Sequence, residues 1–123
     1  MHSFRAAVEA QDMEAATALL SADVVFHSPV AFQPYRGRDV VAPILKAVAR
    51  VFEDFHYVRE IGAPDSADHV LVFRARIGDR EIEGADFLHV DDTGAIDQFT
   101  VMVRPLSAAH ALAAAMQAEL GRQ

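Results

Sequence analysis

The chain has 123 residues, of which 52% are hydrophobic and 24% are charged, as is typical of a single globular domain. Its 18 acidic and 11 basic residues give a formal net charge of −7. This charge repels phosphate backbones and anionic membranes, and the bases form no local patch, so neither nucleic acid nor a membrane is expected as a partner. There is no cysteine, which excludes disulfides and thiolate chemistry. No apolar run reaches the ~18 residues of a membrane span, and the expected location is cytoplasmic.

The N-terminal part of the chain predicts two short helices, because apolar residues recur at helical spacing on either side of a break at Gln11 and Asp12. Asp12 is placed to cap the second helix. A β-rich run at 24–28 follows, and Pro29 ends it because proline has no N–H to donate to a strand ladder.

A loop over residues 30–37 leads to a predicted helix over 38–52, in which Pro43 falls close to the first turn. Strands are then predicted at 55–61, 70–77, 80–90 and 95–104. Ser107 is expected to cap a final helix over residues 108–120.

Helices followed by consecutive antiparallel strands indicate an α+β domain, in which a curved, mostly antiparallel sheet wraps its concave face around the helices. We expect one domain over residues 1–123, with its core at about 3–105 and a C-terminal helix at about 107–121. The concave face is the natural place for a pocket.

The register of one hairpin can be derived from its turn. Gly78-Asp79 fits a two-residue type II′ connection, which pairs Ile77 with Arg80 and places two opposite-charge pairs on one face. The other face then carries Leu71, Phe73, Ala75, Ile77, Ile82, Gly84, Asp86 and Leu88. Asp86 is the only acid in that set. It must find a partner, raise its pKa or lie in a wet cavity, and a structural ion pair is the alternative to a functional role.

If Val90 pairs with Ala95 across the next turn, the last strand points four residues inward, namely Asp97, Phe99, Val101 and Val103. The opposite, outer face of the sheet is more apolar than solvent requires. Its apolar residues are Val70, Val72, Phe87 and Met102, and they predict a homodimer through this face.

The six histidines show no H-x-H or H-E-x-x-H spacing, and no glycine-rich phosphate loop is present, so no metal or other cofactor is expected. The facing of His56 is open, and it could be a proton partner for Asp86. Tyr35 lies on a loop, where it could contact a ligand or cover a core edge.

The segments DVVFHSP, YRGRDVVAPIL and VMVRP, in this order after two helices, resemble the nuclear transport factor 2-like superfamily. Within it, the SnoaL-like and ketosteroid-isomerase-like branch is most similar. The likeness covers about residues 3–105. It implies a cystatin-like α+β fold, a cone of curved sheet whose helices close a deep apolar pocket, and a homodimer.

The isomerases of this branch use a tyrosine on the first helix, a base just before the proline of the first strand and a second acid on a later strand. The resemblance places Phe4, Ser28 and Asp86 at these three positions. Serine cannot move a proton between carbons without an activating base, so steroid isomerisation is not implied. A protonated Asp86 could polarise a carbonyl, and an ionised Asp86 could serve a cyclisation of the polyketide-cyclase type.

The sequence therefore predicts a SnoaL-like protein that binds a small apolar or carbonyl-containing ligand and acts as an isomerase, cyclase or dehydratase through Asp86. The alternative is a non-catalytic ligand-binding or dimerisation module. The residues expected to contact the ligand are Phe4, Ser28, Tyr35, Phe73, Leu88, Phe99 and Val101.

Overall fold

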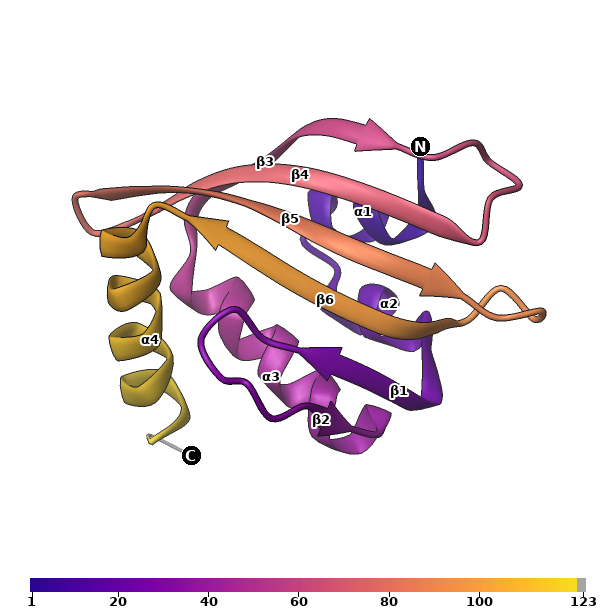
Figure 1. Ribbon diagram of the computed structural model, residues 1–123, viewed down its shortest axis with the longest axis horizontal. Coiled ribbons are helices and arrows are strands. Elements are labelled where there is room, and N and C mark those ends of the chain that lie inside the picture. The colour runs from indigo at the N-terminus through magenta and orange to yellow at the C-terminus, as the bar shows by residue number, and fades with distance from the viewer. Residues whose placement is uncertain (122–123) are drawn as a thin grey trace.

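The computed structural model describes residues 1–121 and shows helices packed on one side of a curved sheet (Figure 1). The helices are α1 (Ser3–Glu9), α2 (Met13–Ala18), α3 (Arg38–Val51) and α4 (Leu106–Leu120). The strands are β1 (Leu20–His27), β2 (Tyr35–Arg36), β3 (Glu53–Ile61), β4 (Asp68–Ile77), β5 (Arg80–Val90) and β6 (Ile96–Arg104). No helix among these residues is long and apolar enough to cross a membrane.

The sheet has the strand order β2-β1-β6-β5-β4-β3 and is open. The β1–β6 pair is parallel, and the other neighbours are antiparallel. Helices α1, α2 and α3 lie along one face, and α4 lies at one end of the molecule (Figure 1). The predicted α+β class and its mostly antiparallel curved sheet are confirmed.

Of the two helix caps predicted from the sequence, one is confirmed and one is wrong. The Asp12 carboxylate accepts a hydrogen bond from the Ala15 N–H at 3.0 Å, as predicted for the cap of α2. The predicted cap at Ser107 is wrong, because α4 already begins at Leu106 and no side chain caps it. The carbonyl of Pro105 accepts the first helical N–H groups instead.

The hairpin register is confirmed along its whole length. Ile77 pairs with Arg80, and the two strands stay in register from there to the far end of β4. Gly78 has a φ of 60°, which suits the first position of a type II′ turn. Arg74 pairs with Glu83 at 3.3 Å, whereas Arg76 binds Glu53 and Asp54 of β3. The inward face of β5 is therefore the one that carries Asp86.

The register of β6 differs from the prediction, because a bulge interrupts its pairing with β5. Val90 pairs with Ile96, and His89 pairs with Gln98, so Asp97 is the extra residue. Ile96 is 1% exposed and takes the inward position. Asp97 turns to the other face, where its carboxylate lies 2.6 Å from His89 Nδ1. The bulge buries an apolar side chain in place of a carboxylate.

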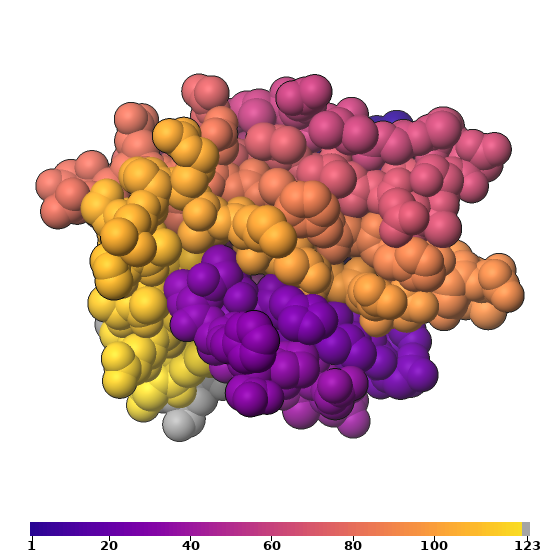
Figure 2. Space-filling view, in the orientation of Figure 1, coloured from indigo at the N-terminus to yellow at the C-terminus, as the bar shows by residue number. Residues whose placement is uncertain are grey.

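The buried apolar side chains of residues 1–121 form two hydrophobic clusters. The larger lies between α1–α3 and the concave face of the sheet, and Phe26, Phe73 and Phe99 are its largest fully buried side chains. The smaller cluster, called here the α4 cluster, consists of Ala47, Ala75, Ile82, Ala108, Leu112 and Met116. It attaches α4 to α3 and to the sheet. Figure 2 views the molecule from the side of β4, β5 and β6, with α4 in yellow at one end.

Candidate functional site

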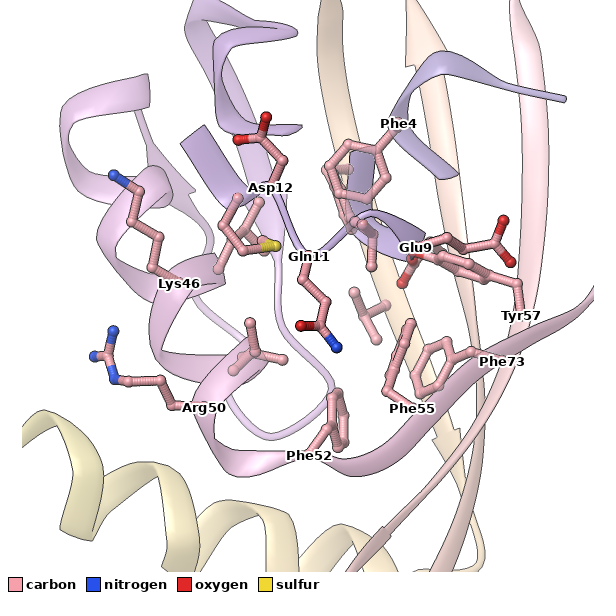
Figure 3. Close-up of a pocket in the computed structure, with 18 of the residues that line it drawn as sticks. Phe4, Glu9, Gln11, Asp12, Lys46, Arg50, Phe52, Phe55, Tyr57 and Phe73 are labelled. Atoms are coloured by element: carbon pink, nitrogen blue, oxygen red, sulfur yellow. Dashed lines mark hydrogen bonds between the residues drawn. The ribbon is translucent and has the colours of Figure 1, made fainter. Parts of the chain in front are cut away.

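A cavity of about 880 Å³ lies between the helices and the concave face of the sheet (Figure 3). This volume is within the range of small-molecule sites. Its inner wall is largely aromatic, and the aromatic residues that line it are Phe4, Phe26, Phe52, Phe55, Tyr57, Phe73 and Phe99. Its rim is polar and charged and consists of Glu9, Gln11, Asp12, Glu14, Lys46, Arg50 and Asp54. The cavity therefore suits a ligand with an apolar body.

Asp86 lies in the wall of this cavity and is 5% exposed. Within residues 1–121 it is the only buried carboxylate. Tyr57 reaches it from β3 and donates a hydrogen bond from its hydroxyl to Asp86 Oδ2 at 3.0 Å. Among the described residues, Tyr57 is the one hydrogen-bond partner of Asp86, so Oδ1 has no donor.

Burial controls the protonation of this pair. It raises the pKa of Asp86 from 3.8 to about 7, against a smaller lowering by the Tyr57 hydrogen bond. The pKa of Tyr57 is also raised, first by burial and then by the charge of Asp86. Tyr57 therefore remains a donor at neutral pH, whereas Asp86 can both accept and return a proton there.

Tyr57 is held from two sides. The guanidinium carbon of Arg5 lies 5.9 Å from the centre of the Tyr57 ring. Arg5 is itself positioned by Glu9 and Glu60, each at 3.4 Å. The ring of Phe55 meets the Tyr57 ring edge-on, with their centres 5.0 Å apart. These contacts orient the phenol that binds Asp86.

The aromatic wall depends on a glycine in the sheet. Phe73 stacks on Phe55 with ring centres 4.9 Å apart, and Phe55 stacks on Phe52 at 5.5 Å. The Phe73 ring lies over Gly84, where an added Cβ would be 2.3 Å from Phe73 Cζ. Gly84 therefore occupies an inward position of β5 because no larger residue leaves room for this ring.

Two cations of α3 stand at the rim, one helical turn apart. Lys46 forms an ion pair with Glu14 of α2, and Arg50 forms one with Glu119 of α4. Figure 3 shows both side chains pointing away from the aromatic wall. The two pairs link α3 to the helices on either side of it.

The structure places some of the predicted ligand contacts around the cavity and others elsewhere. Asp86, Phe4, Phe73, Phe99 and Val101 line it together.

Three of the predicted contacts lie outside the lining. The Ser28 hydroxyl accepts hydrogen bonds from the N–H groups of Val30 and Ala31 and so stabilises its own turn. Tyr35 packs against Phe26 from the edge strand β2. Leu88 is 2% exposed and belongs to the larger hydrophobic cluster.

Tyr57, which lines the cavity and binds Asp86, is the member of the candidate site that the sequence did not single out. His56, considered as the proton partner, is exposed, and its Nδ1 lies 2.9 Å from the Asp54 carbonyl oxygen. Alternation along β3 turns its neighbour Tyr57 inward instead. The sequence could not predict which way Tyr57 faces, because β3 is irregular at two places and Asp54 has a φ of 54°. Within residues 1–121, no three His, Asp or Glu side chains gather as a metal-ligand set.

Comparisons with known proteins agree with this geometry. A family model described as a SnoaL-like domain matches residues 1–99. The crystal structure of a steroid delta-isomerase from Pseudomonas aeruginosa is 41% identical, covers 99% of this chain and 95% of its own, and gives a TM-score of 0.86. No curated protein shows a significant match.

Two further structures share the fold. A protein with a cystatin-like fold from Silicibacter pomeroyi is 34% identical, with 94% of this chain and 81% of its own covered and a TM-score of 0.88. An NTF2-like protein of Cytophaga hutchinsonii is 18% identical over 86% of this chain and 88% of its own, with a TM-score of 0.65, a likeness of fold alone. The chain belongs to the SnoaL-like family of the nuclear transport factor 2-like superfamily.

Proposed function

We propose that this protein binds a small, mainly apolar ketone in the cavity and catalyses an isomerase-type proton transfer, with Asp86 as the acid/base. One observation carries the proposal: Asp86, the one buried carboxyl among residues 1–121, lies in an aromatic cavity, and its pKa is raised to about 7. A general base works best when its pKa is close to the working pH. The similarity to the Pseudomonas aeruginosa steroid delta-isomerase supports this class of reaction.

In the proposed reaction, ionised Asp86 removes a proton from the carbon next to the ligand carbonyl. The C–H electron pair moves into the ligand to form an enolate, and Asp86 becomes a neutral acid. Asp86 then returns the proton to another carbon of the conjugated system, so the carbon–carbon double bond shifts and the enzyme is restored. Tyr57 holds Oδ2 throughout and leaves Oδ1 to carry the proton.

The Asp86→Asn variant tests this role, because asparagine keeps an acceptor for Tyr57 but cannot take up a proton. We expect kcat for a β,γ-unsaturated ketone, followed by the ultraviolet absorbance of the conjugated product, to fall by roughly 10²–10⁴-fold. Binding of the saturated ketone should persist. Full turnover by this variant, or none by the unaltered protein, would contradict the proposal.

Tyr57→Phe is the matched variant. The Tyr57 hydrogen bond lowers the pKa of Asp86, so its loss should raise that pKa. The rise of kcat/KM with increasing pH should then occur at higher pH, while Asp86 is still present as the proton carrier. A pH profile that does not move would show that Tyr57 does not affect the pKa of Asp86.

The alternative to catalysis is a non-catalytic role in ligand binding or dimerisation. We further propose that the protein forms a homodimer through the outer face of the sheet. Phe87 of β5 and Met102 of β6 are 40% and 59% exposed there. They lie on adjacent strands, since Phe87 pairs with Thr100 and Ala85 with Met102. Exposed apolar side chains on neighbouring strands favour an interface.

A further inference from the structure

Leu112 of α4 lies where the α4 cluster meets the cavity. Three residues of α4 belong to that cluster, namely Ala108, Leu112 and Met116, and of these only Leu112 lines the cavity. Its exposed fraction is 3%. Leu112 is therefore packed on nearly all sides, and it forms part of the cavity wall.

The surrounding contacts place this wall at one end of the cavity. Figure 3 shows α4 running past Phe52, at the end away from Phe4. Val48 of α3 and Phe52, which directly follows α3, line the cavity and also pack against the α4 cluster. The ion pair between Arg50 and Glu119 fixes the C-terminal part of α4 to α3. This wall is therefore anchored by both apolar packing and charge.

We propose that Leu112 is a specificity-determining residue that sets the longest ligand the cavity accepts. The proposal rests on the proposed function only in requiring an apolar ligand in the cavity, and does not depend on catalysis by Asp86. Each methylene added to a ligand contributes about fourfold in affinity while there is apolar space to fill. Once the ligand reaches Leu112, a further methylene must displace a packed side chain, which costs affinity.

The test uses straight-chain methyl ketones that grow by one methylene at a time, with binding measured by calorimetry. The unaltered protein should show the fourfold gain per methylene up to a certain length and no gain beyond it. Leu112→Ala should move this break by one or two methylenes toward longer ligands, and Leu112→Phe should move it toward shorter ones. Leu112→Val, a smaller truncation, serves if the alanine variant does not fold.

Met116→Ala is the matched control, because Met116 lies one turn further along α4, belongs to the same cluster and does not line the cavity. It should reduce stability without moving the break. A break that stays in place in folded Leu112 variants, or moves equally in Met116→Ala, would overturn the proposal.

The corresponding alkanes separate this proposal from the proposed function. If the affinity of the alkanes also stops rising at the same chain length, and the carbonyl adds no affinity, the proposed role of Leu112 is supported and the proposed recognition of a ketone is not. If neither series binds, the cavity takes no apolar ligand and both proposals fail.

Discussion

At the scale of single residues, the site depends on one buried acid and the phenol that binds it. Asp86 could be predicted from sequence because a two-residue turn fixes the register of its hairpin and charge pairs mark the opposite face. Tyr57 could not, because β3 is irregular on both sides of it. A carboxylate on an apolar face predicts that a partner exists, but the partner itself comes from a strand that is distant in sequence.

The raised pKa of Asp86 makes stability depend on pH. The folded state binds a proton up to about pH 7, whereas the unfolded chain releases it near pH 3.8. The contribution of Asp86 to stability is therefore full below the unfolded pKa and is lost as pH rises through the folded one. We expect it to fall by about 2–3 kcal/mol between about pH 5 and about pH 8.

Urea unfolding of Asp86→Asn against the unaltered protein measures this difference. The variant lacks the titration, so its stability relative to the unaltered protein should rise by that amount over the same pH interval. A constant difference between the two proteins would show that Asp86 titrates alike in the folded and unfolded chains.

At the scale of elements, alternation predicts a strand face only where no residue is inserted. The hairpin of β4 and β5 has no bulge, and every inward residue there was predictable. The bulge in β6 shifts Asp97 outward. The short strand β2 forms within the predicted loop because it pairs with Val25 and Phe26 of β1. Such features depend on neighbouring strands and cannot be derived from local pattern.

Gly84 tests how tightly the sheet and the aromatic wall are fitted. An added Cβ would meet the Phe73 ring at 2.3 Å and the Met102 carbonyl oxygen at 2.9 Å. We expect Gly84→Ala to lower the free energy of unfolding by roughly 1–3 kcal/mol and to push the Phe73 ring into the cavity. Phe73→Leu in the same chain should recover part of the loss, as a double-mutant cycle would measure. Additive effects would mean that the two residues do not share this space.

At the scale of the whole molecule, the two hydrophobic clusters and the outer apolar face of the sheet lie in different places and have different roles in the account. The larger cluster surrounds the cavity, the α4 cluster forms part of the wall at one end of it, and the outer face of β5 and β6 presents Phe87 and Met102. The overall class was predictable because helices and strands follow each other in simple order. The place of α4 in the cavity wall was not, because its apolar stripe does not reveal which surface it covers.

The outer face predicts the oligomeric state. Phe87→Glu and Met102→Glu should convert a dimer into a monomer in sedimentation equilibrium, because a charge would be buried at the interface. Phe32, which is 95% exposed outside the sheet, provides the control. Phe32→Glu should remain dimeric. A monomeric unaltered protein, or dissociation caused by the Phe32 change, would rule out this interface.

The most direct test of the central claim is an NMR titration of the Asp86 side-chain carboxyl carbon, assigned by comparison with Asp86→Asn. If Asp86 is the proton carrier of a buried aromatic site, its signal should titrate with a midpoint at about pH 7, as its pKa of about 7 requires. A midpoint near the ordinary aspartate value of about 3.9 would contradict the account, because the carboxylate would then be permanently ionised at neutral pH.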